Sequence, residues 1–231
     1  MSKSYVIVLA TSKGGAGKTT LAQGLLSHWF SLGHTPAIID ADPQEGILKT
    51  HNPDGPLARV PVIGNAEESI GETIEELKEN YSPVIVDTGG FRNRTNIMAI
   101  ANSDLVLIPL KPSTIDVSGA VETYELVQEI NETPERKGNP IKAFMVLTMT
   151  QKGTVIARHV RDELEAAKYP LLKSEMANRV AYPEASIQGL SPVILAPDSI
   201  AARDIAAIAS ELKKYLGKTP MKSLNKDLIS L

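Results

Sequence analysis

Short apolar runs alternate with amphipathic segments along most of the chain. The apolar runs occupy residues 5–10, 36–40, 83–87, 104–110 and 141–149. Each run is continuously hydrophobic, which is typical of strands that are buried on both faces of a sheet. Apolar residues recur at helical spacing in residues 21–30, 66–80, 113–132, 154–168 and 200–216. This alternation predicts an α/β fold, a doubly wound and mainly parallel sheet with helices on both faces.

The connecting segments carry weaker patterns. Residues 45–65 contain three prolines and are interpreted as a loop with one short strand candidate at 59–63. A short edge strand is predicted at 171–172 and a helical turn at 178–185. No linker divides the chain, so we expect one domain over residues 1–231 with a loosely ordered tail at about 218–231.

A glycine-rich turn separates the first predicted strand from the first predicted helix. It reads Lys13-Gly14-Gly15-Ala16-Gly17-Lys18-Thr19-Thr20. Glycines let successive backbone N–H groups point inward, and the following helix adds the positive end of its dipole, so this context favours phosphate binding. We expect Lys18 to reach the β- and γ-phosphates of a nucleotide and the Thr19 hydroxyl to bind Mg²⁺. Thr20 is a candidate partner for the α-phosphate.

The turn departs from the usual G-x-x-x-x-G-K-[ST] pattern. Ser12 stands where the first glycine is expected, and Lys13 adds a second lysine. Lys13 lies five positions before Lys18, so we do not expect both lysines to reach the same phosphates. Lys13 is then either a solvated loop lysine or a second positive charge for a nucleotide, including a nucleotide held by a second subunit.

The string from Ser12 to Thr20 resembles the deviant P-loop of the ParA/MinD ATPases. In that family the additional lysine contacts the nucleotide of the partner subunit. The resemblance therefore implies ATP and Mg²⁺ as ligands, an ATP-dependent homodimer, and ATP hydrolysis that is weak without a partner. No helix-turn-helix pattern precedes the P-loop, so the chain looks most like a short ParA partition protein.

Carboxylates follow two of the predicted strands. Asp40-Ala41-Asp42-Pro43-Gln44 ends one strand, and Asp87 ends another. The carboxyl ends of parallel strands are where ligands bind, so we expect these acids to face the P-loop, with Asp40 and Asp42 on the same side. An apolar strand that ends in Asp87 is suited to hold Mg²⁺ through water. By the resemblance, Asp42 orients the attacking water and Asp40 supports the Mg²⁺ shell.

Further positions follow from these motifs. Gly89 and Gly90 leave the backbone free to approach the γ-phosphate and to move, which makes this loop a candidate switch. The arginines at 92 and 94 are either loop charges or contacts to a partner. By the resemblance, the loop around Pro197 covers the adenine, and the segment 108–112 faces the dimer partner.

Composition narrows the class of protein. The chain has 231 residues, 42% of them hydrophobic, and a net charge of −3. It contains no cysteine, which excludes disulfides, thiolate metal sites and Fe–S clusters. The apolar runs are too short to span a bilayer, so we expect a cytoplasmic protein.

The leading functional hypothesis is a DNA-segregating ATPase. Its ATP-bound dimer would bind DNA without sequence preference, associate with the nucleoid, and leave DNA when a ParB-like or other cargo-linked activator stimulates hydrolysis. Basic residues would form the DNA contact, with Arg203 the best single candidate. The candidates are Arg158, Arg161, Arg179, Arg203, Lys213 and Lys214.

Two alternatives remain open at this point. A MinD-like regulator would need a membrane-binding C-terminal helix, and Met221, Leu224, Leu228 and Leu231 have helical spacing. That tail is short, lacks bulky aromatic residues and contains Asp227, so membrane binding is not expected. A metabolic P-loop enzyme acting on a small carboxylated substrate would explain Lys18 and Asp87, but it would not explain Lys13 together with the motif at 40–44.

Overall fold

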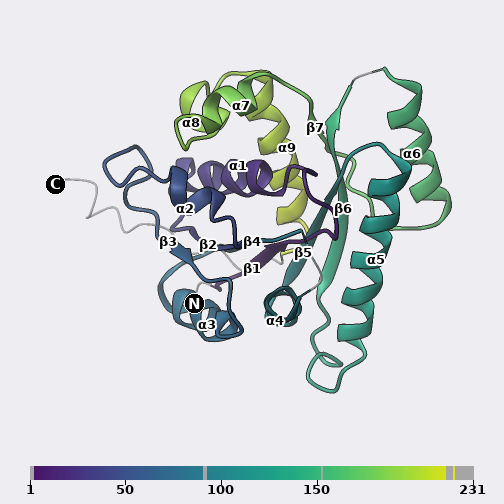
Figure 1. The fold of residues 1–231 in the computed structure, drawn as a ribbon, viewed down its shortest axis with the longest axis horizontal. Helices are drawn as coiled ribbons and strands as arrows, with labels where there is room; N and C mark the ends of the chain where they lie inside the picture. Colours follow the sequence, from purple (N-terminus) through teal and green to yellow (C-terminus); the bar gives the residue numbers. More distant parts are fainter. Residues whose placement is uncertain (1–2, 91–92, 152, 217–220, 222–231) are drawn as a thin grey trace.

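The computed structural model describes residues 3–90, 93–151, 153–216 and 221, and these residues form a sheet with helices on both sides (Figure 1). The seven strands lie in the order β3-β2-β4-β1-β5-β6-β7. Every pairing between neighbouring strands in the described residues is parallel, which confirms the predicted doubly wound sheet. The strands are β1 Val6–Leu9, β2 Ala37–Ala41, β3 Val62–Gly64, β4 Val84–Thr88, β5 Leu105–Leu110, β6 Lys142–Thr150 and β7 Met176–Ala177.

The helices form two layers around this sheet. One layer contains α1, α2, α7, α8 and α9, and the other contains α3, α4, α5 and α6 (Figure 1). The bounds are α1 Lys18–Ser31, α2 Gly46–Thr50, α3 Ile70–Asn80, α4 Arg94–Ala101, α5 Thr114–Asn131, α6 Val155–Ala166, α7 Ala181–Ser186, α8 Pro192–Leu195 and α9 Ile200–Lys213. In the part of the chain that the structure describes, no helix is both long and apolar enough to cross a membrane.

The core lies on both faces of the central strands. All residues of β1, β2, β4 and β5 are buried, as their continuous apolar sequences predict. Alternate residues of each strand serve opposite layers: Ile7 and Leu9 pack toward α1 and α9, whereas Val6 and Val8 pack toward α3, α4 and α5. The central strands are therefore held from both sides, and the loops at their carboxyl ends start from fixed positions.

Several boundaries differ from the sequence prediction. The segment predicted as a loop at 45–65 contains α2, and the unpredicted helix α4 begins at Arg94. Residue 171 makes only an isolated bridge to Met145, and the edge strand lies instead at Met176–Ala177. The predicted loose tail lies outside the described residues except for Met221, as do Arg92 and the stripe residues Leu224, Leu228 and Leu231.

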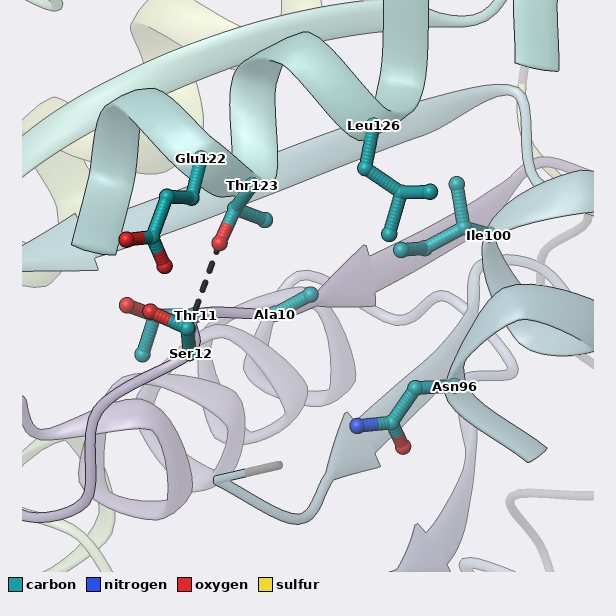
Figure 2. Close-up of a pocket in the computed structure, with 8 residues that line it drawn as sticks. All are labelled: Ala10, Thr11, Ser12, Asn96, Ile100, Glu122, Thr123 and Leu126. Atoms are coloured by element: carbon teal, nitrogen blue, oxygen red, sulfur yellow. Dashed lines mark hydrogen bonds between the residues drawn. The ribbon is translucent and has the colours of Figure 1, made fainter. Parts of the chain in front are cut away.

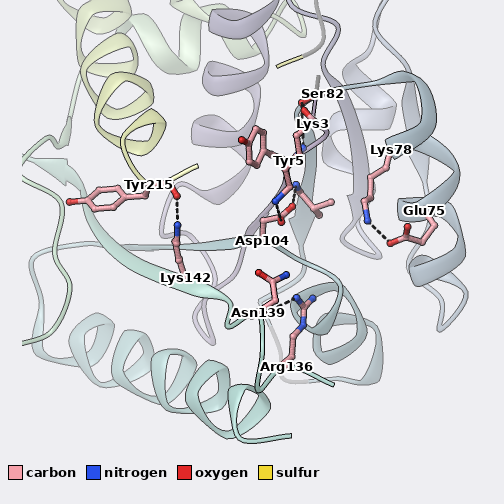
Figure 3. Close-up of polar contacts among 11 residues, drawn as sticks. Lys3, Tyr5, Glu75, Lys78, Ser82, Asp104, Arg136, Asn139, Lys142 and Tyr215 are labelled. Carbon is pink, nitrogen blue, oxygen red and sulfur yellow. Dashed lines mark hydrogen bonds and ion pairs between the residues drawn. The ribbon is translucent and has the colours of Figure 1, made fainter. Parts of the chain in front are cut away.

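Polar contacts fix the amino ends of the strands (Figure 3). Because the strands are parallel, this end of the sheet is opposite to the end that carries the P-loop. Asp104, just before β5, accepts hydrogen bonds from the backbone N–H of Val6 at 2.8 Å and from Nζ of Lys3 at 3.3 Å. The backbone N–H of Tyr5 donates to the hydroxyl of Ser82 at 3.4 Å. These contacts attach the start of β1 to the segments that lead into β4 and β5.

Candidate nucleotide-binding site

The glycine-rich turn follows β1 at the middle of the sheet and leads into α1. Gly15 and Gly17 have φ values of 72° and 80°, in the left-handed region that side chains disfavour. The hydroxyl of Thr148 donates to the carbonyl of Ala16 at 2.8 Å and ties the turn to β6. The α1 helix begins at Lys18, so its first N–H groups face the turn. This is the backbone geometry that the motif predicts for a phosphate cradle, and phosphate binding by these residues stays a prediction.

Lys18 lies inside this cradle. Its side chain is buried, and Nζ donates to the carbonyl of Lys13 at 3.4 Å. Burial lowers the pKa of Lys18, while the negative charges of Asp87 and Asp42 oppose that shift. Lys18 is therefore close enough to both carboxylates for an electrostatic interaction. This agrees with the prediction that the acids at the carboxyl ends of the strands face the P-loop.

Asp87 and Thr19 form a direct contact across the cradle. The Thr19 hydroxyl donates to Oδ2 of Asp87 at 2.7 Å. Asp87 is buried, its Oδ1 has no hydrogen-bond partner, and burial raises its pKa to about 7. A buried carboxylate oxygen without a donor beside a hydroxyl fits a hard divalent cation such as Mg²⁺, which prefers oxygen ligands.

Asp40 has a different environment from the one the sequence predicts. Its Oδ2 accepts the backbone N–H groups of Ile47 at 2.9 Å and Leu48 at 3.0 Å, and its Oδ1 accepts that of Asp42 at 3.3 Å. Burial raises the pKa of Asp40, and these three hydrogen bonds oppose that shift. Asp40 thus holds the first turn of α2 and the loop that carries Asp42. A contribution of Asp40 to the Mg²⁺ shell stays a prediction.

Asp42 lies beside the predicted switch loop. Its Oδ1 accepts the backbone N–H of Gln44 at 2.9 Å, which fixes the carboxylate within its own turn. A Cβ built on Gly89 would lie 3.8 Å from the same oxygen, and a Cβ on Gly90 would lie 3.2 Å from the backbone nitrogen of Gly14. The loop after β4 therefore passes between Asp42 and the P-loop at a distance that leaves little room for side chains.

Two more lysines flank the turn. Lys13 is exposed, and its Cγ lies 2.8 Å from where a Cβ on Gly119 of α5 would stand. Nζ of Lys111, at the end of β5, lies 3.9 Å from the position of a Cβ on Gly15. Lys111 belongs to the segment 108–112, which the sequence predicts to face the dimer partner, but its proximity to the P-loop was not predicted. This proximity could have been predicted, because Lys111 directly follows a buried strand, β5, whose carboxyl end adjoins that of β1.

The remaining predicted residues form none of the hydrogen bonds or ion pairs described for this cluster. Pro197 is exposed between α8 and α9, and its contact with adenine stays a prediction. Two of the basic candidates are engaged by carboxylates: Arg161 reaches Glu175 at 3.3 Å, and Arg179 pairs with Asp204 at 2.7 Å. The exposed candidates are Arg158 on α6, Arg203 and Lys213 on α9, and Lys214 directly after α9. The α6 and α9 helices belong to opposite layers of the sheet (Figure 1).

Residues 5–212 match the family model of the VirC1 protein. The chain belongs to this family. The VirC1 match covers the P-loop, both carboxylate motifs and the whole sheet, and with the relatives below it makes the chain a P-loop ATPase of the ParA/MinD type. The resemblance seen in the P-loop sequence is thereby confirmed.

Similar proteins span nearly the same length as this VirC1-family chain. Maintenance of carboxysome distribution protein A of Halothiobacillus neapolitanus is 28% identical over 217 residues, 91% of this chain and 97% of that protein. An ATP complex of McdA from Cyanothece has a TM-score of 0.71 at 20% identity and covers 98% of this chain and 100% of that chain. MinD of Pyrococcus horikoshii, solved with Mg-ADP, has a TM-score of 0.74 at 16% identity over 93% of this chain and 98% of that chain.

Proposed function

We propose that this VirC1-family protein binds and hydrolyses ATP with Mg²⁺ and positions DNA or another cargo in the manner of ParA proteins. The observation that carries the proposal is the convergence of Lys18, Asp42 and Asp87 around one glycine-rich turn, with Lys13 exposed beside it. The fold likeness to ATP- and ADP-bound McdA and MinD supports the choice of nucleotide.

Each residue has a separate task in this proposal. The backbone of the P-loop and Lys18 bind the phosphates, while Thr19 would provide an oxygen ligand for Mg²⁺ and Asp87 would hold the ion through water. When bound, Mg²⁺ supplies positive charge that stabilises the phosphate oxygens. Asp42, fixed by the N–H of Gln44, orients the attacking water. Asp40 keeps the Asp42 turn in place through its three backbone contacts.

The dimer and the DNA contact extend the same proposal. Lys13 is exposed and leans toward α5, so it is available to the nucleotide of a second copy of the chain. ATP binding then produces the dimer, and the dimer binds DNA through its exposed basic residues. Arg203 remains the first candidate, and like Arg158, Lys213 and Lys214 it is exposed. A cargo-linked activator stimulates hydrolysis and release.

The decisive experiment is retention of the protein on nonspecific duplex DNA with ATP, with ADP and without nucleotide, over a series of salt concentrations. We expect retention only with ATP and Mg²⁺, and a steep loss as salt rises, because phosphate contacts release counterions. The Lys18→Ala protein is the matched control and should show no retention in any state. Absence of DNA retention by the ATP-bound wild type would contradict the DNA part of the proposal.

Liposome binding distinguishes the main alternative. Cosedimentation with anionic vesicles in the presence of ATP, together with no retention on DNA, would favour a MinD-like membrane regulator instead. ATP turnover that requires a small carboxylated compound would favour a metabolic enzyme. Neither result is expected.

A further inference from the structure

Gly119 lies in the interior of α5, where glycine lowers helix stability relative to alanine. The packing against the P-loop explains the absence of a side chain there. A Cβ at this position would lie 2.6 Å from Oγ of Ser12 and 2.8 Å from Cγ of Lys13. The glycine therefore lets the residues that begin the P-loop lie directly on the surface of α5.

Hydrogen bonds complete this contact (Figure 2). The backbone N–H of Ser12 donates to Oγ1 of Thr123 at 3.2 Å, and the Thr123 hydroxyl donates to the carbonyl of Gly119 at 2.8 Å. The Ser12 hydroxyl donates to the same carbonyl at 3.3 Å. The hydroxyl hydrogen of Thr123 is donated to a carbonyl within α5. The hydroxyl oxygen can therefore only accept a further hydrogen bond, and it accepts the one from the backbone N–H of Ser12.

The consequence falls on Lys13, the next residue. Its backbone carbonyl accepts from Nζ of Lys18, and the first carbons of its side chain rest against α5 at Gly119. Lys13 forms no ion pair within the described residues, so these two contacts set the direction in which its exposed side chain leaves the loop. The direction of Lys13 thus depends on α5 rather than on the cradle that holds Lys18.

The same contact borders a cavity of about 120 Å³ between α4 and α5. Ser12 and Thr123 line it on one side, and Asn96 of α4 lines it on the other (Figure 2). The side-chain amide of Asn96 donates to the carbonyl of Gly89 at 3.1 Å. Asn96 therefore links the wall of this cavity to the loop that follows Asp87.

We propose that Gly119 and Thr123 are positioning residues that aim Lys13 at the nucleotide of a second copy of the chain. This inference rests on the proposed ATP-dependent dimer. The α5 helix then determines whether the dimer forms, although it contributes no side chain to the cradle described above.

The test compares four variants by ATP affinity and by ATP-dependent dimerisation. Thr123→Val keeps the shape of the side chain and removes the acceptor for Ser12, whereas Thr123→Ser keeps the acceptor. Gly119→Ala introduces the colliding Cβ, and Ser118→Ala, an exposed change one residue away, is the matched control. Affinity is measured with a fluorescent ATP analogue and Mg²⁺, and dimerisation by analytical ultracentrifugation.

We expect Thr123→Val and Gly119→Ala to weaken ATP-dependent dimerisation by about tenfold while ATP affinity changes by less than about twofold. Thr123→Ser and Ser118→Ala should behave like the wild type. In a Lys13→Ala background Thr123→Val should cause no additional loss, because the residue it positions is already absent.

Three results would overturn the inference and are distinguishable from one another. If the wild type dimerises with ATP and Thr123→Val does so equally well, the positioning role is wrong while the proposed dimer stands. If the wild type stays monomeric with ATP, the dimer itself is wrong and the inference falls with it. Equal losses of dimerisation and ATP affinity would indicate general damage to the P-loop and would also contradict the inference.

Discussion

The hydroxyl of Thr19 donates a hydrogen bond to Oδ2 of Asp87 at 2.7 Å, and this contact joins the start of α1 to the end of β4. The register of the sheet brings the two together, because Leu9 lies opposite Asp87 and the P-loop begins three residues after Leu9, at Ser12. In the register of the sheet, Asp87 also lies opposite Asp40 of the neighbouring strand β2. The loops that follow β1, β2 and β4 therefore begin next to one another at the carboxyl end of the sheet.

Stability without Mg²⁺ should fall as pH rises toward neutrality. Burial raises the pKa of Asp87 to about 7, so between an ordinary carboxyl pKa and about 7 the folded state binds more protons than the unfolded state. The free energy of unfolding therefore decreases across that window, by up to about 4 kcal/mol. Urea unfolding in EDTA at several pH values measures the decrease.

Asp87→Asn should remove the part of this pH dependence that comes from Asp87, since the amide does not ionise, and should leave the part from Asp40, whose pKa burial also raises. The variant should be more stable than the wild type above about pH 7 in EDTA and should lose the stabilisation that Mg²⁺ with nucleotide gives the wild type. Asp198→Asn, at an exposed position, is the control and should retain the wild-type profile. Parallel pH profiles for the wild type and Asp87→Asn would contradict the assignment.

Asp42→Ala should separate ATP binding from hydrolysis. The carboxylate is fixed by the N–H of Gln44 and makes none of the backbone contacts that Asp40 makes to α2. We expect ATP affinity to stay within about threefold and the hydrolysis rate to fall by about 100-fold or more, as for loss of a group that orients the nucleophile. Phosphate release measured with and without activator tests this. Wild-type turnover in the variant would exclude Asp42 from the reaction.

Arg179 and Arg203 should respond differently to alanine substitution. Arg179 makes two hydrogen bonds to Asp204, at 2.7 Å and 3.2 Å, whereas Arg203 is exposed. Arg179→Ala should lower the free energy of unfolding by about 1–3 kcal/mol. Arg203→Ala should leave stability unchanged and weaken ATP-dependent DNA retention. Chemical denaturation and the DNA assay on both variants separate the two roles, and equal stability losses would show that Arg203 is also structural.

Gly189→Ala should be among the more damaging glycine substitutions. Its φ is 65°, and a Cβ there would lie 1.8 Å from the carbonyl oxygen of Thr50 at the end of α2. Gly153 has a similar φ of 78° with nothing within 4 Å, so Gly153→Ala carries the backbone strain alone, about 1 kcal/mol. We expect Gly189→Ala to lower stability by at least about 2 kcal/mol more, as measured by thermal or urea unfolding. Equal effects would mean that the loop moves away from α2.

The sequence predicted the central strands and the P-loop well, for a physical reason. A continuous apolar run such as 104–110 is buried on both faces only in the middle of a sheet, so its position could be predicted. A glycine-rich turn directly before a helix likewise has a defined backbone geometry. The helix cap at Ser113 was also predictable: its hydroxyl accepts the N–H of Asp116 at 3.2 Å. Gly33, with φ of 80°, lies two residues after the last residue of α1, where glycine commonly follows a helix.

The missed elements depend on contacts between distant segments. The α2 helix has five residues among prolines and forms because Asp40, from another element, accepts two of its N–H groups. The α4 helix is an exception, because its start has a local sequence signal: Asn93 is its N-cap residue, and the Asn93 side chain accepts the N–H of Asn96. The edge strand at 176–177 is only two residues long, so its pairing with β6 rather than its own sequence determines where it lies.

The attachment of β1 to Asp104 has a practical consequence for watching this protein in cells. The strands in the described residues all run in the same direction, so the chain enters β1 at the amino end of the sheet, next to Lys3. This end is opposite to the one that carries the P-loop. A fluorescent reporter joined ahead of Lys3 therefore starts from the side that faces away from ATP and from Lys13. Its movements across a living cell should report those of the native protein.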